Sequence, residues 1–150
     1  MELQNCINYL LTGAQHQVFQ LMCARLAPLD VTPGQYGVLY CLWRQTATNP
    51  KDIAQILGLE NSTISGVLDR MQKKGLIERV ISPNDRRCIE VVLTEKGQAL
   101  EGPVLEIISQ VNELVLSRFS SEDASTLLNC LRAIGEADLT DAPEAGIERS

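Results

Sequence analysis

Hydrophobic residues recur every three or four positions over much of the chain, which predicts a mainly helical protein. Over residues 3–26 this spacing describes an amphipathic helix of about six turns. Pro28 is expected to end that helix. Thr32 and Gln35 then form a capping-box pattern, which predicts the start of a second helix. Residues 36–45 are apolar on nearly every side, so we expect this helix to be buried.

Two shorter helices are predicted after it. Asn49 is the predicted N-cap of segment 51–57, and Gly58 can adopt the left-handed conformation that often ends a helix. Asn61 is predicted to cap the next helix, over residues 61–74. Two short helices joined by a tight, glycine-containing link are typical of a helix-turn-helix.

The apolar spacing changes from about 3.6 to 2 after this helix. Segments 76–81 and 88–93 have the alternation of strands, and the turn-forming residues Ser82, Pro83, Asn84 and Asp85 lie between them. This pattern predicts a β-hairpin. The fold class is therefore mainly α, a winged helix-turn-helix with a two-stranded wing.

Two more helices are predicted beyond the hairpin. The first is capped by Thr94 and bent near its start by Pro103, and its long apolar stripe resembles a coiled-coil seam. The last helix follows the capping segment 120–123. Residues 139–150 are polar and acidic, so we expect a flexible tail there.

Charge is distributed unevenly along this chain of net charge −6. Residues 49–97 hold eight basic and seven acidic side chains, whereas residues 98–150 hold three basic and ten acidic ones. Charges farther apart than roughly 8 Å are screened at physiological salt, so a local basic surface can still face nucleic acid. The acidic total therefore does not exclude a DNA partner.

Other classes of protein find little support in the composition. The longest apolar runs are too short to span a bilayer and the start lacks a basic leader, so we expect a cytoplasmic protein, nucleoid-associated when bound to DNA. The five cysteines include no C-x-x-C pair, and we expect no metal and no cofactor. With one histidine, no nucleophile motif and no phosphate loop, the chain is not expected to be an enzyme.

Small polar and basic side chains on the outward face of helix 61–74 favour the DNA major groove. The predicted contacts there are Asn61, Ser62, Thr63, Ser65, Gly66, Arg70 and Lys73. At the hairpin tip, Arg86 and Arg87 suit the negative potential of a narrow minor groove, and Asp69 or Asp85 is expected to orient one of them. Phosphate contacts are predicted from Thr32, Gln35 and Lys51. An ordinary solvated helix start, a solvated turn and a protein-docking winged helix are the alternatives.

Three segments together resemble the MarR (multiple antibiotic resistance regulator) family of bacterial transcription factors. They are LDRMQKKGLIER at 68–79, DRR at 85–87 and LTEKG at 93–97, and the resemblance covers about residues 3–137. It implies a homodimer, with residues 1–29 and 98–138 as a helical dimerisation module and residues 30–97 as the DNA-binding lobe. It also implies a pseudo-palindromic operator, repression by default, and control by small aromatic or phenolic ligands or by thiol oxidation.

Two kinds of switch follow from that resemblance. A ligand pocket between module and lobe would draw on Tyr9, His16, Arg25, Tyr36, Tyr40 and Trp43, although the last three are more typical of a core than of a ligand pocket. A redox switch would use Cys6, with Tyr36 or Tyr40 donating a hydrogen bond to its thiolate. No nearby cationic residue in the sequence favours a reactive thiol at Cys6.

Overall fold

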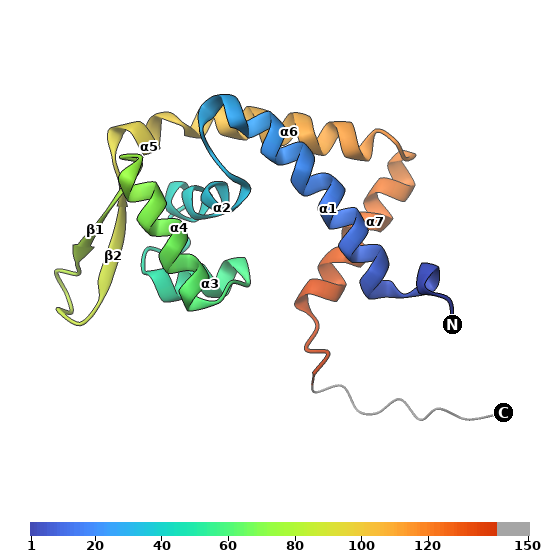
Figure 1. Cartoon of the computed structure of the whole chain (residues 1–150), viewed down its shortest axis with the longest axis horizontal. Coiled ribbons are helices and arrows are strands. Elements are labelled where there is room, and N and C mark those ends of the chain that lie inside the picture. Colours follow the sequence, from blue (N-terminus) through green and yellow to red (C-terminus); the bar gives the residue numbers. More distant parts are fainter. Residues whose placement is uncertain (141–150) are drawn as a thin grey trace. The chain divides into compact units, whose positions relative to one another are not determined.

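Helices and one hairpin make up the computed structural model, which describes residues 1–140 (Figure 1). The elements are η1 Leu3–Asn5, α1 Ile7–Leu26, η2 Ala27–Leu29, α2 Pro33–Trp43, α3 Pro50–Leu57, α4 Asn61–Lys73, β1 Ile77–Ile81, β2 Ile89–Leu93, α5 Glu95–Ala99, α6 Glu101–Leu116 and α7 Ser121–Glu136. The predicted fold class, a mainly α winged helix-turn-helix, is confirmed. Most of the predicted tail, from residue 141 on, lies outside the described residues.

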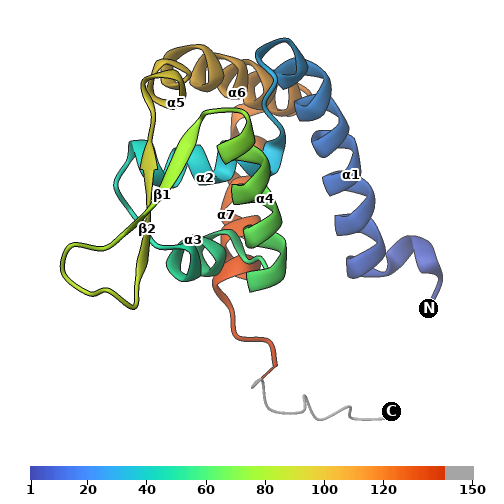
Figure 2. The ribbon, with the colours of Figure 1, turned by 60° about the vertical axis from the view of Figure 1, so that its left-hand side comes forward.

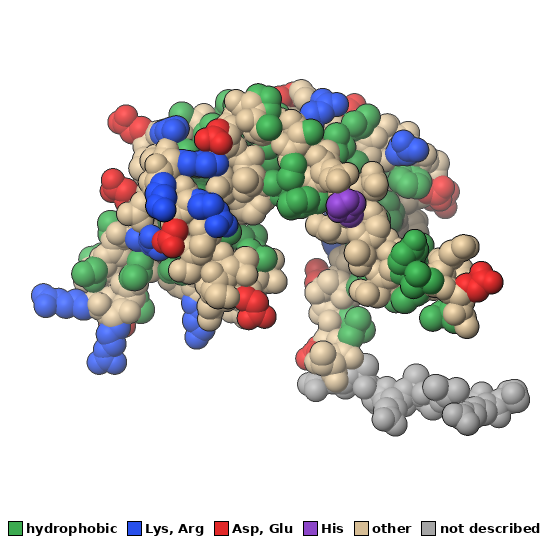
Figure 3. Space-filling view, viewed as in Figure 1, with side chains coloured by type: hydrophobic (Ala, Val, Ile, Leu, Met, Phe, Trp, Pro, Cys, Tyr) green, Lys and Arg blue, Asp and Glu red, His purple; other side chains and the backbone are tan. Residues whose placement is uncertain are grey.

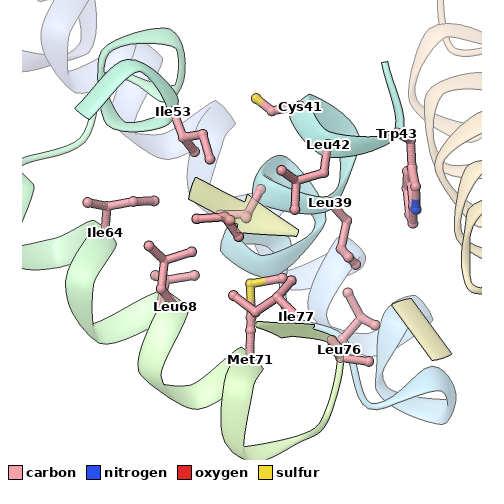
Figure 4. Packing of buried hydrophobic residues seen from close by; sticks show 14 of the residues in the cluster. Leu39, Cys41, Leu42, Trp43, Ile53, Ile64, Leu68, Met71, Leu76 and Ile77 are labelled. Carbon is pink, nitrogen blue, oxygen red and sulfur yellow. The ribbon is translucent and has the colours of Figure 1, made fainter. Parts of the chain in front are cut away.

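The chain divides into two compact units, residues 1–112 and 113–150. In the first, apolar side chains of α2, α3, α4 and the hairpin form one core (Figure 4). Leu39, Ile53, Leu68, Met71 and Ile77 are among its fully buried members. Each such side chain contributes about 1.5–3 kcal/mol by leaving water. The prediction that α2 is buried is confirmed, because most of its side chains lie in this core.

Local capping contacts fix where the helices of the lobe begin and end. The Thr32 hydroxyl accepts the Gln35 backbone N–H at 3.2 Å, and the Gln35 side chain accepts the Thr32 N–H at 3.2 Å, so the capping box is confirmed. Asn49 caps α3 as predicted. Gly58 and Gly75 have φ angles of 64° and 72°, in the left-handed region that favours glycine. Gly58 ends α3, and Gly75 follows the end of α4.

Two helix starts differ from the predictions. Asn61 is the first residue of α4 and not its cap, because the Ile64 N–H already bonds to the Glu60 carbonyl at 3.0 Å. The first helix does not run unbroken from residue 3. The Cys6 backbone is extended and separates η1 from α1, so Cys6 occupies the N-cap position of α1.

The helix predicted after the hairpin consists of two helices that meet at Leu100. Thr94 caps α5 as predicted, since its side chain accepts the Gly97 N–H. Pro103 has no N–H to donate to the Ala99 carbonyl, so the hydrogen-bond ladder is interrupted there. It resumes when the Val104 N–H bonds to the Leu100 carbonyl at 2.9 Å. The predicted bend is therefore a break.

The hairpin is anchored to the lobe at one end only (Figure 2). Its strands pair antiparallel, with Ile77 opposite Leu93 and Ile81 opposite Ile89. Ile77 and Val91 are buried, whereas Ile81 and Ile89 on the same face are 67% and 48% exposed. The outer half of the hairpin therefore extends beyond the core.

The second unit contributes α7, which Ser120 caps by accepting the Asp123 N–H at 3.1 Å. This start agrees with the predicted capping segment. Along residues 1–140, no helix combines the length and the apolar character that crossing a membrane requires.

Gly97 gives a direct test of how closely the hairpin packs. Its buried Cα lies so near the Leu76 carbonyl oxygen that an added Cβ would overlap with that backbone atom. We expect Gly97→Ala to lower the free energy of unfolding by about 3 kcal/mol, because the backbone cannot yield as a flexible side chain would. Urea denaturation at one fixed protein concentration measures this change. Gly102→Ala is the control, since no atom lies within 4 Å of its added Cβ, and equal stability of the two variants would contradict the prediction.

Candidate nucleic-acid interface

The N-terminal half of α4 presents small polar side chains to solvent. Burial of Ile64, Leu68 and Met71 fixes the rotation of the helix. The polar residues Asn61, Ser62, Thr63 and Ser65 are consequently exposed. Short side chains allow a helix backbone to lie deep in a groove about 12 Å wide, where hydroxyl groups can reach base edges.

A groove runs between the start of α3, the side of α4 that carries Ile64 and Leu68, and the hairpin. Its lining combines basic, hydroxyl, amide and apolar groups: Pro50, Lys51, Asn61, Ile64, Ser65, Leu68, Arg79 and Ile89. The structure thereby brings Lys51, a predicted phosphate contact, together with Asn61 and Ser65, two predicted contacts of the recognition helix. Arg70 lies along α4 with its Nη1 atom near Gly66, 3.5 Å from the position of an added Cβ.

Basic side chains gather over α4 and the hairpin (Figure 3). Arg86 and Arg87 are exposed in the loop between the strands, and within residues 1–140 neither guanidinium has a hydrogen-bond or ion-pair partner. Asp85 organises this loop by accepting the Arg87 backbone N–H at 3.0 Å. Both guanidinium groups thus remain available at the tip.

The predicted pairing of Asp69 or Asp85 with a guanidinium at the tip is wrong. Asp69 pairs instead with Arg79 of β1, at 2.5 Å between Oδ1 and Nη2. Arg79 is the nearer partner because β1 packs beside α4, whereas the tip lies beyond the end of the core. The Asp85 carboxylate accepts hydrogen bonds within the loop, from the Arg87 N–H and from the Cys88 thiol.

Arg79 is a site residue that the sequence predictions missed. Besides Asp69, it binds Gln72 of α4, with Nε donating to Oε1 at 2.8 Å. The position of Arg79 in the strand could have identified it as a site residue, because Arg79 shares a face with buried Ile77 and Val91. A charged residue on the core-facing side of a strand requires a polar partner nearby.

One predicted phosphate contact is also wrong. The Gln35 side chain is 2% exposed, and its Oε1 accepts hydrogen bonds from the Thr32 N–H and from Lys74 Nζ at 3.0 Å. It therefore has no access to a phosphate. Thr32 and Lys51 are exposed, and for them the phosphate role stays a prediction. Lys74 also donates to the Asp30 carbonyl at 2.8 Å, so it ties the end of α4 to the segment before α2.

The predicted pocket residues lie in different surroundings. Tyr9 and His16 line an open groove made by α1 alone. Trp43 is buried and donates its indole N–H to the Gly97 carbonyl at 3.1 Å, so it belongs to the core. Arg25 is exposed at the end of α1. For these residues other than Trp43, ligand binding stays a prediction.

The two remaining aromatic candidates contact each other. The rings of Tyr36 and Tyr40 meet edge to face with centroids 6.0 Å apart. Burial raises the pKa of Tyr36, and the neighbouring Tyr40 raises it further. Arg44 lies over the Tyr40 ring at 5.6 Å. Cys6 is partly buried, and the structure records no hydrogen bond from either tyrosine to its thiol within residues 1–140.

A helix-turn-helix followed by an arginine-tipped hairpin defines a winged-helix DNA-binding protein. The MarR family model matches residues 31–89. The organic hydroperoxide resistance transcriptional regulator of Bacillus subtilis is 31% identical over 136 residues, which cover 91% of each chain. This chain therefore belongs to the MarR family of DNA-binding transcriptional regulators.

Solved structures agree with that assignment. A probable transcriptional regulator from Pseudomonas aeruginosa is 26% identical with a TM-score of 0.82, over 89% of this chain and 99% of that one. The transcriptional repressor CouR bound to a 23-mer DNA duplex is 29% identical with a TM-score of 0.81, over 89% and 95% of the two chains. These similar proteins are transcriptional regulators and not enzymes.

The wing loop yields a prediction about Cys88. The Asp85 carboxylate raises the pKa of the Cys88 thiol, with smaller effects from desolvation and Glu90. Asp85→Asn removes that negative charge, so we expect more thiolate near neutral pH and faster alkylation of Cys88 by iodoacetamide. Mass spectrometry of digested samples measures the rate. Cys130, also exposed, is the internal control, and an unchanged Cys88 rate relative to Cys130 would contradict the loop geometry.

Proposed function

We propose that two copies of this chain bind a pseudo-palindromic operator and repress transcription. In each copy, α4 would enter a major groove while the hairpin tip reaches the adjacent minor groove. The observation that carries the proposal is the combination of an exposed, hydroxyl-lined helix start with two arginines that have no protein partner in the described residues. The DNA-bound structure of CouR, at 29% identity, supports it.

The start of α4 and the residues around it have different proposed roles in DNA binding. The exposed side chains of Asn61, Ser62, Thr63 and Ser65 would contact bases, and half-buried Gly66, which has no side chain, would let the helix approach the groove closely. Arg70, Lys73, Lys51 and Thr32 would neutralise or bind phosphates, which sets register and affinity more than sequence preference.

A homodimer is supported by apolar side chains that a single chain leaves in water. On η1 and α1 these are Leu3, Ile7, Tyr9 and Leu10, and in the second unit they are Leu114, Phe119, Leu131 and Ile134. Apolar groups of this kind mark association surfaces. We therefore assign residues 1–29 and 98–138 to a dimerisation module and residues 30–97 to the reading lobe. Two lobes also supply the contacts that one lobe lacks for specific binding.

Removing both arginines of the tip tests the proposal. Arg86→Ala combined with Arg87→Ala should weaken operator binding by about 2 kcal/mol or more, because two charge-assisted contacts are lost. The operator is first selected from random or genomic DNA with the wild-type protein, and affinity is measured by gel shift at fixed salt. The salt dependence should also become less steep, since fewer counterions are released.

The control variant removes the same charge elsewhere. Arg118→Ala with Arg132→Ala lies outside the reading lobe and should change affinity little. Light scattering should give twice the chain mass of 16.5 kDa for both variants. Equal gel-shift midpoints for the wing variant and the wild type would refute the assigned role of the tip.

Control of DNA binding by organic hydroperoxides is a second candidate. It is favoured by the 31% identical Bacillus subtilis relative, which is named as an organic hydroperoxide resistance regulator. Cys6, partly buried at the start of α1, is the candidate thiol. Its thiolate would attack the peroxide oxygen, which gives a sulfenic acid at Cys6 and releases the alcohol.

Cumene hydroperoxide tests this second candidate. We expect treatment to weaken operator binding and to add one oxygen at Cys6. Cys6→Ser should abolish the response, whereas Cys130→Ser, the matched change at an exposed cysteine, should keep it. Undiminished binding with Cys6 still reduced by mass spectrometry would remove peroxide control from the function.

A further inference from the structure

A single side chain connects the middle of the wing to the recognition helix. Arg79 of β1 donates from Nε to Gln72 at 2.8 Å and from Nη2 to Asp69 at 2.5 Å. Both acceptors belong to α4 and are three positions apart, so they lie on one face of the helix. Two bonds from a planar guanidinium restrain direction as well as distance, which a single contact cannot do.

This contact lies where the hairpin leaves the core. Arg79 is opposite Val91, whose N–H bonds to the Thr48 carbonyl at 2.7 Å. Beyond that pair, Ile81 and Ile89 are largely exposed, and apolar packing no longer holds the strands to the lobe. The angle between the wing and α4 is therefore set at the level of Arg79 and Val91.

We propose that Arg79 is a positioning residue that, through Asp69 and Gln72, holds the wing at the angle that DNA binding requires. With this angle fixed, Arg86 and Arg87 and the exposed start of α4 can meet the same operator at once. The inference rests on the proposed function and extends it to residues that need not touch a base.

The negative charge of Asp69 allows a direct test of the positioning role of Arg79. Its carboxylate is 53% exposed beside the helix that faces DNA. If only charge mattered, removing that carboxylate would strengthen binding to phosphates. If its restraint on Arg79 matters, removing it weakens operator binding, and the two explanations predict opposite signs. An ion pair this exposed contributes little to folding stability, so variants should remain folded.

The experiment compares Asp69→Asn, Arg79→Lys and the double variant. Asp69→Asn keeps the shape of the side chain, and Arg79→Lys keeps the positive charge but cannot make both bonds. We expect each to weaken operator binding about tenfold, with unchanged thermal midpoints. The double variant should lose about as much as either single one, because both disrupt one contact.

Glu78→Gln is the matched control. It removes a carboxylate from the neighbouring position of β1, on the opposite face of the strand, and we expect equal or tighter binding. Hydroxyl-radical footprinting supplies a readout that general instability would not produce. In Asp69→Asn, protection of the minor-groove sugars by the wing should fade, while protection of guanine N7 in the major groove by α4, measured in parallel by dimethyl sulfate methylation, should persist.

The possible results separate the two proposals. Operator binding by Asp69→Asn that equals or exceeds wild-type binding would overturn the positioning role, as would losses that add in full in the double variant. Either result leaves the proposed function standing if the wing-tip variant is defective. If the wild-type protein selects no DNA sequence, the proposed function and this inference both fall.

Discussion

Burial of the apolar stripe of α4 against the rest of the lobe determines which polar residues of this helix face solvent. An α-helix turns about 100° per residue, so once Ile64, Leu68 and Met71 are buried, the residues on the opposite side of α4 must face outward. Ile53 of α3 and Ile77 of β1 complete the surface that receives the stripe. The hydrophobic core therefore sets the direction of the polar residues as well as the stability of the lobe.

A locally basic surface is compatible with a negative net charge, because some basic side chains bind partners within the protein and others remain available to DNA. Lys74 is bound to Asp30 and Gln35, and Arg79 is bound to Asp69 and Gln72, so both serve the internal structure. Arg86 and Arg87 extend from a loop whose backbone is organised without their guanidinium groups. Counting charges along a sequence treats all of these residues alike, whereas the structure separates those that hold the lobe from those that remain free to bind.

Features that depend on neighbours in sequence were predictable, and those that depend on packing were not. The capping box at Thr32, the cap at Asn49 and the left-handed Gly58 all arise within a few residues, and the structure confirms them. The partner of Asp69 is ten positions away across a helix and a strand, and choosing Arg79 over the arginines of the tip required knowing where the strand lies. Gln35 shows another limit, because its capping role consumed the side chain that had also been assigned to phosphate. The roles of the DNA-contacting residues themselves remain predictions.

Two polar contacts lie at the ends of the reading lobe, where the chain enters it after α1 and leaves it toward α6. Lys74, at the end of α4, is bound to the Asp30 carbonyl in the segment that follows α1. Trp43, at the end of α2, is bound to the Gly97 carbonyl in α5, just before the helix break at Leu100. A ligand or an oxidised thiol can change DNA affinity only by interacting differently with two arrangements of the protein. Contacts of this kind are where such arrangements can differ without unpacking the core, because a hydrogen bond can exchange partners while a buried stripe such as that of α4 cannot move without exposing apolar surface.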